Sequence, residues 1–154
     1  MIQLKEGMKA PGFEGIDQNG KTVRLSDFAG KKLVLYFYPQ DDTTTCTIEA
    51  CNLRDNYESF INKGYVVLGV SPDNEKSHQR FIKKFSLPFP LIADVSKKIV
   101  NDYGVWGEKK MFGRDYMGVL RTTFIINEKG IIDKIISIVK SAEHSKQIFD
   151  MYNQ

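Results

Sequence analysis

The sequence predicts an α/β fold in which helices flank a mixed central sheet. Three almost wholly apolar runs, at about 32–38, 65–70 and 122–126, have the length and composition of strands that are buried on both faces. Segments with apolar residues at helical spacing separate these runs, as expected of a layered fold. A turn at 127–130 leads into a further apolar run at 131–139, and this hairpin makes the sheet mixed. We expect one domain over 1–154, because this length suits a single core.

The first elements are predicted to form a short N-terminal β-hairpin. Strand-like runs at 13–17 and 22–25 lie on either side of Asn19-Gly20, and Asn-Gly strongly favours a tight hairpin turn. Ser26-Asp27 is suited to cap one helical turn, which Gly30 ends. This hairpin would extend the sheet fold ahead of the central strand.

Helices are predicted in each connection between the apolar strands. The first runs over about 45–63, and the second opens at Ser71-Pro72-Asp73-Asn74 and carries Phe81, Ile82 and Phe85. Pro88 and Pro90 break the second helix before a short strand at 91–93.

The last part of the chain completes the alternation of strands and helices. Asp94 or Ser96 is expected to cap a helix that runs to Tyr103, and Ser141 to cap a C-terminal helix. The inner side of that last helix would carry Ile148, Phe149 and Met151. The resulting order, β-α-β-α-β-α-β-β-α, is a thioredoxin-like architecture with the N-terminal hairpin and an insertion at 109–117.

Composition excludes several classes of function. The net charge is +3, and the basic residues form well-separated pairs, which is typical of a solvated surface and not of a nucleic-acid patch. The N-terminus has no signal-peptide pattern, and no apolar stretch reaches the length of a membrane helix. We therefore expect a cytoplasmic protein that binds neither nucleic acid nor membrane. In that compartment a cysteine pair is more often catalytic or metal-binding than a structural disulfide.

Cys46 is placed where a thiol becomes reactive. The apolar strand ends at Pro39, and three threonines at 43–45 then offer N-cap hydroxyls just before Cys46. The first turn of a helix has unpaired backbone N–H groups, and these groups and the helix dipole favour a thiolate. The alternative is that Cys46 serves only as a small apolar side chain at a helix start.

Cys51 is the second of only two cysteines and follows Cys46 by five residues. In an intact helix such residues have Cα atoms about 8.6 Å apart, whereas a disulfide requires about 4.4–6.8 Å. Either Cys51 is an inert core residue, or the first turns unwind so that it can reach Cys46. The second alternative is a redox cycle with a conformational switch.

Several motifs, in order along nearly the whole chain, resemble the peroxiredoxins. Pro39-x-x-x-Thr43-x-x-Cys46 resembles the peroxidatic motif of that family. Cys46-Thr47-x-x-x-Cys51 and the Arg121-x-Thr123-Phe124-Ile125-Ile126 strand are similar to the Q-type branch, the bacterioferritin comigratory proteins. The family usually has Pro-Gly before the peroxidatic cysteine, whereas this chain has Thr44-Thr45. The opening Gly7-x-x-Ala10-Pro11-x-Phe13 and Val70-Ser71-x-Asp73 also match.

The resemblance implies a role for each of five residues. Cys46 would attack peroxide and become a sulfenic acid, and Cys51 would resolve it as an intramolecular disulfide. Thr43 would hold the thiolate and a peroxide oxygen, Arg121 would stabilise the negative charge, and Pro39 would shield the thiolate. A thioredoxin-type dithiol protein would then reduce the disulfide, and no cofactor or metal is implied.

Simpler roles remain open for these residues. Thr43 could be only a helix cap, Arg121 an ordinary surface ion pair, and Pro39 a plain strand terminator. Glu49 could orient Arg121 through a salt bridge, or it could be an exposed acid that favours the dipole of the first helical turn.

Other candidate sites are less convincing. His78 and His144 are far apart in the sequence, so they do not form the close ligand pairs of a zinc site, and neither lies in a motif of a cysteine hydrolase. Asp41-Asp42 could bind a cation, although adjacent loop acids are usually only solvated. Trp106 is expected to be a packed aromatic residue in a loop, or to line the approach of substrate.

The sequence thus predicts a thiol peroxidase that reduces hydrogen peroxide and small organic hydroperoxides, as a monomer or weak homodimer. Two other functions stay open. A general thiol–disulfide oxidoreductase would normally carry Cys-x-x-Cys, whereas this chain has four residues between its cysteines. A redox sensor would use oxidation of Cys46 only to unfold the helix for a partner.

Overall fold

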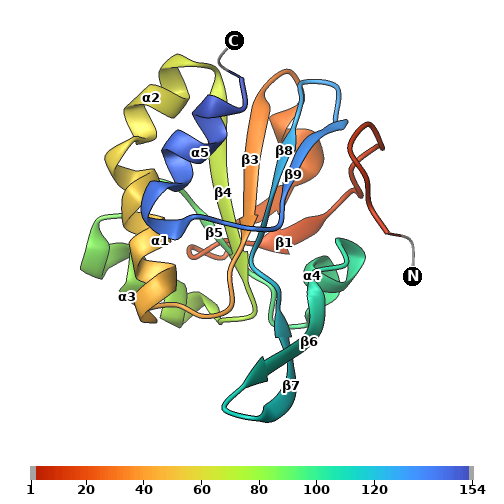
Figure 1. Ribbon diagram of the computed structural model, residues 1–154. Coiled ribbons are helices and arrows are strands. Elements are labelled where there is room, and N and C mark those ends of the chain that lie inside the picture. Colours follow the sequence, from red (N-terminus) through yellow and green to blue (C-terminus); the bar gives the residue numbers. More distant parts are fainter. Residues whose placement is uncertain (1–2, 153–154) are drawn as a thin grey trace.

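The computed structural model describes residues 3–152 and centres on a five-stranded mixed sheet in the order β5-β4-β3-β8-β9 (Figure 1). Its strands are β3 (Lys32–Phe37), β4 (Tyr65–Ser71), β5 (Leu91–Ala93), β8 (Thr122–Ile126) and β9 (Ile132–Ile136). The first three run parallel, whereas β8 pairs antiparallel with both β3 and β9. The predicted strands and the mixed character of the sheet are confirmed.

The two faces of the sheet bury separate hydrophobic clusters, which explains why β3 is apolar at nearly every position. Val34 and Tyr36 face a cluster with α1 (Thr44–Asp55), α2 (Tyr57–Asn62), α3 (Glu75–Phe85) and α5 (His144–Asp150). Leu33, Leu35 and Phe37 face the opposite cluster, which includes α4 (Lys98–Asp102) and the N-terminal segment. Figure 1 shows these layers on either side of the sheet.

The N-terminal hairpin consists of β1 (Glu14–Ile16) and β2 (Thr22–Arg24), as the Asn19-Gly20 turn predicts. Gly20 adopts φ +76°, a conformation that glycine adopts without steric cost. The helical turn that follows is a 3-10 turn over Leu25–Phe28. The Asp27 carboxylate accepts a hydrogen bond from the Arg24 N–H there. Of the two predicted capping residues, Ser26 and Asp27, it is therefore Asp27 whose side chain binds the start of the turn.

The helix predicted over 45–63 is wrong in one respect, because it is broken at Asn56 into α1 and α2. The Asn56 side-chain amide donates to the Asn52 carbonyl at 2.9 Å, an example of a polar side chain competing with helix hydrogen bonds. Lys97 occupies the N-cap position of α4, but both predicted residues bind amides of its first turn: the Asp94 carboxylate accepts from Ile99 and Val100, and the Ser96 hydroxyl accepts from Lys98.

Three further expectations need correction. The insertion at 109–117 belongs to a regular hairpin of β6 (Trp106–Met111) and β7 (Arg114–Val119), so Trp106 begins a strand and does not lie in a loop. At the other end, a 3-10 turn over Ser141–Glu143 precedes α5, and the Ser141 side chain makes no capping bond. Met151 follows α5 and is 38% exposed, so it does not lie on the inner side. No helix within 3–152 is long and apolar enough to cross a membrane.

Candidate active site

Cys46 lies in the first turn of α1, just beyond the loop that leaves the end of β3. Its side chain is buried, at 2% exposure. Thr43 occupies the N-cap position, and its carbonyl accepts the first helical hydrogen bond from the Thr47 amide at 2.9 Å. The predicted position of the thiol at a helix N-terminus is confirmed, and this position favours a thiolate.

Arg121 reaches Cys46 from the start of β8, the strand that pairs with β3 in the sheet. Because β8 runs antiparallel to β3, Thr122 pairs with Phe37 and the start of β8 lies at the end of β3. Arg121 directly precedes β8, and its Nη2 donates to the Cys46 Sγ at 3.2 Å. Its side chain is only 18% exposed, so it is not an ordinary surface ion pair.

Glu49 shares the same guanidinium. Arg121 Nη1 donates to Glu49 Oε1 at 2.6 Å, and the glutamate side chain is fully buried. Cys46 and Glu49 are three residues apart on α1 and lie on the same side of the helix, so one arginine bridges both. The first alternative for Glu49, an acid that orients Arg121, is the one that this geometry supports.

The charges of this group are set by burial and by mutual attraction. Burial raises the pKa of Glu49 to about 7, although Arg121 acts in the opposite direction. Burial lowers the pKa of Arg121, but the negative charges of Glu49 and Cys46 raise it by more, so its net pKa is raised. The guanidinium therefore stays charged throughout the physiological range, while Glu49 changes its charge within it.

His144 was not predicted as a neighbour of this site. It is fully buried at the start of α5, and its Nε2 lies 3.7 Å from Glu49 Oε2. The Nδ1 donates to Gln147 Oε1 at 2.9 Å, so Nε2 is free to accept from the Thr123 hydroxyl at 2.8 Å. Burial lowers the pKa of His144 to about 4, hence the ring is neutral.

Thr43 and Pro39 lie in the loop that carries Cys46. Pro39 is half-buried two residues after the end of β3, and Thr43 donates its hydroxyl to the Gln40 carbonyl at 3.0 Å. The Thr43 side chain makes no capping bond to α1. Because its proton is engaged, its oxygen is left as an acceptor for a hydroxyl donor.

Both cysteines are free thiols, and α1 is unbroken between them. Cys51 is half-buried and lies outside the two hydrophobic clusters. Its placement in the same intact helix agrees with the predicted separation, so a Cys46–Cys51 bond requires the helix to unwind.

Lys109 of β6 is a second basic group that the sequence did not indicate. Its Nζ donates to the Val119 carbonyl at 3.0 Å, two residues before Arg121. Burial, followed by the charge of Arg121, lowers the pKa of Lys109, and Cys46 acts in the opposite direction. The hairpin β6–β7 therefore brings a partly buried cation toward the site.

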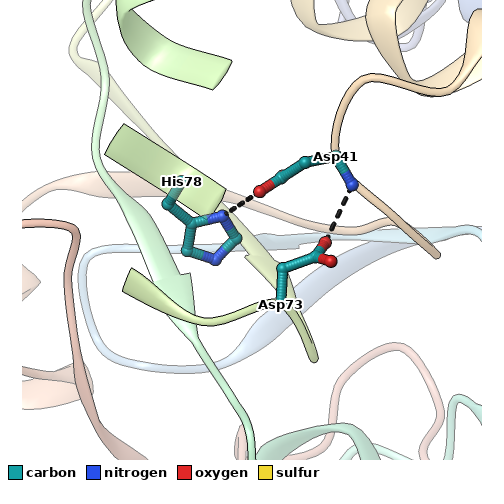
Figure 2. Close-up of side chains that lie close together, drawn as sticks. All are labelled: Asp41, Asp73 and His78. Carbon is teal, nitrogen blue, oxygen red and sulfur yellow. Dashed lines mark hydrogen bonds and ion pairs between the residues drawn. The ribbon is translucent and has the colours of Figure 1, made fainter. Parts of the chain in front are cut away.

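One cluster within 3–152 has the residue types of a metal site, namely Asp41, Asp73 and His78 (Figure 2). Both oxygens of Asp41 already accept hydrogen bonds from Tyr38, Ser77 and His78. The neighbouring Asp42 is exposed and pairs with Lys84 at 2.8 Å. The hydrogen bonding of Asp41 gives no support to the cation site that Asp41-Asp42 suggested.

A helix-terminal thiol held by a buried arginine on a thioredoxin-like sheet defines a thiol peroxidase, and comparison with known proteins agrees. The family model described as AhpC/TSA matches residues 7–135. The chain therefore belongs to the AhpC/TSA family and is a peroxiredoxin, a peroxidase of the oxidoreductase class.

Within that family, its relatives are the Bcp or Q-type proteins. The chain is 46% identical over 143 residues to peroxiredoxin Bcp of Bacillus subtilis, covering 93% of this chain and 91% of that protein. It is 40% identical over 144 residues to peroxiredoxin Bcp of Escherichia coli, covering 94% and 92%.

Solved structures agree with the sequence comparison. A cysteine-to-serine mutant of Xylella fastidiosa PrxQ has a TM-score of 0.92 at 28% identity, covering 99% of this chain and 97% of that one. A mutant of Xanthomonas campestris peroxiredoxin Q has a TM-score of 0.85 at 32% identity, covering 91% and 89%. The thioredoxin-like fold and the Q-type resemblance are thus confirmed.

Proposed function

We propose that this peroxiredoxin reduces hydrogen peroxide and small organic hydroperoxides through a Cys46 thiolate. The supporting observation is the 3.2 Å hydrogen bond from Arg121 Nη2 to Cys46 Sγ, at the first turn of a helix. A fixed guanidinium and the amides of a helix start together stabilise negative charge on sulfur. These contacts would favour the reactive, anionic form of the nucleophile.

In the first step, the Cys46 thiolate attacks one peroxide oxygen and the O–O bond breaks. Cys46 becomes a sulfenic acid, and the other oxygen takes up a proton and leaves as water or an alcohol. The Thr43 oxygen would accept a hydrogen bond from the peroxide O–H, because its own proton is held by Gln40. Arg121 would stabilise the charge as it moves along the O–O bond. Pro39 would limit the access of water to the thiolate.

In the second step, the Cys51 thiol attacks the sulfenic sulfur, a disulfide forms and water leaves. This step requires α1 to unwind, since both cysteines lie in one intact helix. A thioredoxin-type dithiol protein would return the enzyme to its reduced form by disulfide exchange.

Peroxide consumption by the purified protein, with a dithiol donor, tests this proposal. Cys46→Ser should abolish turnover, and full activity of that variant would contradict the mechanism. Cys51→Ser should complete the first turnover and then stall or over-oxidise without an external thiol. Mass spectrometry after one equivalent of peroxide should show the loss of two hydrogens, mapped to the two thiols.

A further inference from the structure

Asp41 is a buried acid in the loop between β3 and α1, five residues before Cys46, and the chemistry above does not use it. It is 8% exposed, although it lies in a loop. A buried carboxylate is costly unless its charge is paired and its oxygens are hydrogen-bonded. Its contacts therefore indicate what it holds in place.

Four groups fix Asp41, through both its side chain and its backbone, and Figure 2 shows two of them, His78 and Asp73. Its Oδ1 accepts from the Tyr38 hydroxyl at 2.6 Å, and its Oδ2 accepts from the Ser77 hydroxyl at 2.8 Å and from His78 Nδ1 at 2.7 Å. Its amide donates to Asp73 Oδ2 at 2.8 Å. The loop is thereby joined to α3 and to the segment that follows β4.

His78 has a hydrogen-bond partner on each of its two ring nitrogens. It is fully buried, and its Nε2 lies 2.9 Å from the Ile92 carbonyl, which can only accept. Its Nδ1 faces a carboxylate that already accepts two hydroxyl protons. Both ring nitrogens are therefore hydrogen-bonded, and the Asp41–His78 contact is part of a fully paired, buried polar network.

The chain turns sharply directly after this pair. Asp42 has φ +58°, in the left-handed region that non-glycine residues seldom adopt. It is exposed, and Thr43 and the first turn of α1 follow it. The Asp41–His78 pair thus fixes the last backbone position before the segment that carries Cys46.

We propose that Asp41 and His78 form a positioning anchor that holds the upstream end of the Cys46 segment and favours the helical, peroxide-reactive form over the unwound form that makes the disulfide. This inference rests on the proposed Cys46–Cys51 disulfide step. The anchor touches neither sulfur. It acts by keeping the start of α1 against β4 and α3, so that Cys46 stays at Arg121.

Loosening such an anchor has two opposite effects on the reaction. The peroxide step requires Cys46 beside Arg121, so it should become slower. The resolving step requires an unwound helix, so it should become faster. A variant that merely damages the fold would slow both steps, which separates the anchor from a purely structural role.

The test measures both steps in single-turnover experiments on the full chain. Asp41→Asn should lower the second-order rate constant for hydrogen peroxide by roughly tenfold, since small displacements of a reacting group have large effects. It should raise the first-order rate constant for disulfide formation. Ser77→Ala, which removes one hydrogen bond and leaves the Asp41–His78 contact, should shift both constants the same way by less. Asp42→Asn is the matched control and should change each by less than about twofold, because its ion pair is exposed.

The outcomes separate the anchor from the proposed function. If wild-type protein forms no intramolecular disulfide, the proposed function and the anchor both fail. If wild type forms it, but Asp41→Asn and Ser77→Ala leave both rate constants unchanged or lower both together, the anchor alone is overturned. An Asp41→Asn variant that does not fold leaves Ser77→Ala to decide by the same criterion.

Discussion

Replacing Glu49 with glutamine should reveal that burial, and not the ion pair with Arg121, dominates the titration of this acid. Glu49 is fully buried and bonded to Arg121 at 2.6 Å, so two opposing effects act on it. Burial disfavours its charge and the guanidinium favours it, and the outcome is a pKa raised from 4.5 to about 7. Glutamine has a similar shape and no proton to lose.

The sign of the effect follows from proton binding. Between pH 4.5 and about 7, folded protein keeps a proton on Glu49 that the unfolded chain has released. Raising the pH through this window therefore lowers the free energy of unfolding of the wild type. At about 1.4 kcal/mol per pH unit, the loss is up to about 3 kcal/mol. The variant does not lose this stability.

Denaturant unfolding of both proteins, under reducing conditions at several pH values, measures the effect. The difference in the free energy of unfolding, variant minus wild type, cancels the contributions of all other groups that titrate alike in both. We expect this difference to rise by up to about 3 kcal/mol from pH 4.5 to 7. A difference that falls with rising pH would refute the reasoning, since it would mean that pairing with Arg121 lowers the pKa of Glu49.

Three further experiments test the same site. His144→Asn should give the opposite pH profile of stability. Burial lowers the pKa of His144 to about 4, so the wild type gains stability as the pH rises from 4 to 6.5. The difference in the free energy of unfolding, variant minus wild type, should therefore fall over this range. Arg121→Lys should slow peroxide reduction in stopped-flow measurements by roughly 10²–10³-fold, because an ammonium does not reproduce the two-pronged contact, whereas Arg24→Lys at an exposed pair should have little effect. Amide exchange at 44–53 should increase on oxidation, and equal exchange in both redox states would argue against an internal disulfide.

The sheet was predictable because its strands are buried on both faces. Each apolar position of β3 belongs to one of two clusters, so the signal in the sequence is a continuous run. The hairpin β6–β7 has no such signal. Most of its β7 residues are exposed, and its turn places Phe112 at φ +53° and Gly113 at φ +75°. Phenylalanine is an unusual residue at that first position, so the turn could not be recognised.

For the site, too, local features could be predicted from the sequence and long-range contacts could not. The position of Cys46 could be predicted from the local sequence, because neighbouring residues determine where the strand ends and where the helix begins. The partnership of Arg121 with Cys46 came from the family resemblance, and the register of β8 against β3 explains it. The contact of His144 with Glu49 depends on how α5 packs against α1, and no spacing along the chain encodes that packing.

The contacts of Arg121 bear on how the charge at the proposed nucleophile, Cys46, would be controlled. One guanidinium binds two acidic groups, Cys46 and Glu49, and only Cys46 is the proposed nucleophile. When Glu49 is protonated, the charge of Arg121 is available to Cys46 alone; when Glu49 ionises, two negative charges share one cation. Because burial raises the pKa of Glu49 to about 7, this division of charge changes within the physiological range. The electrostatic environment of Cys46 is therefore set jointly by the local helix start and by tertiary contacts that the sequence pattern does not reveal.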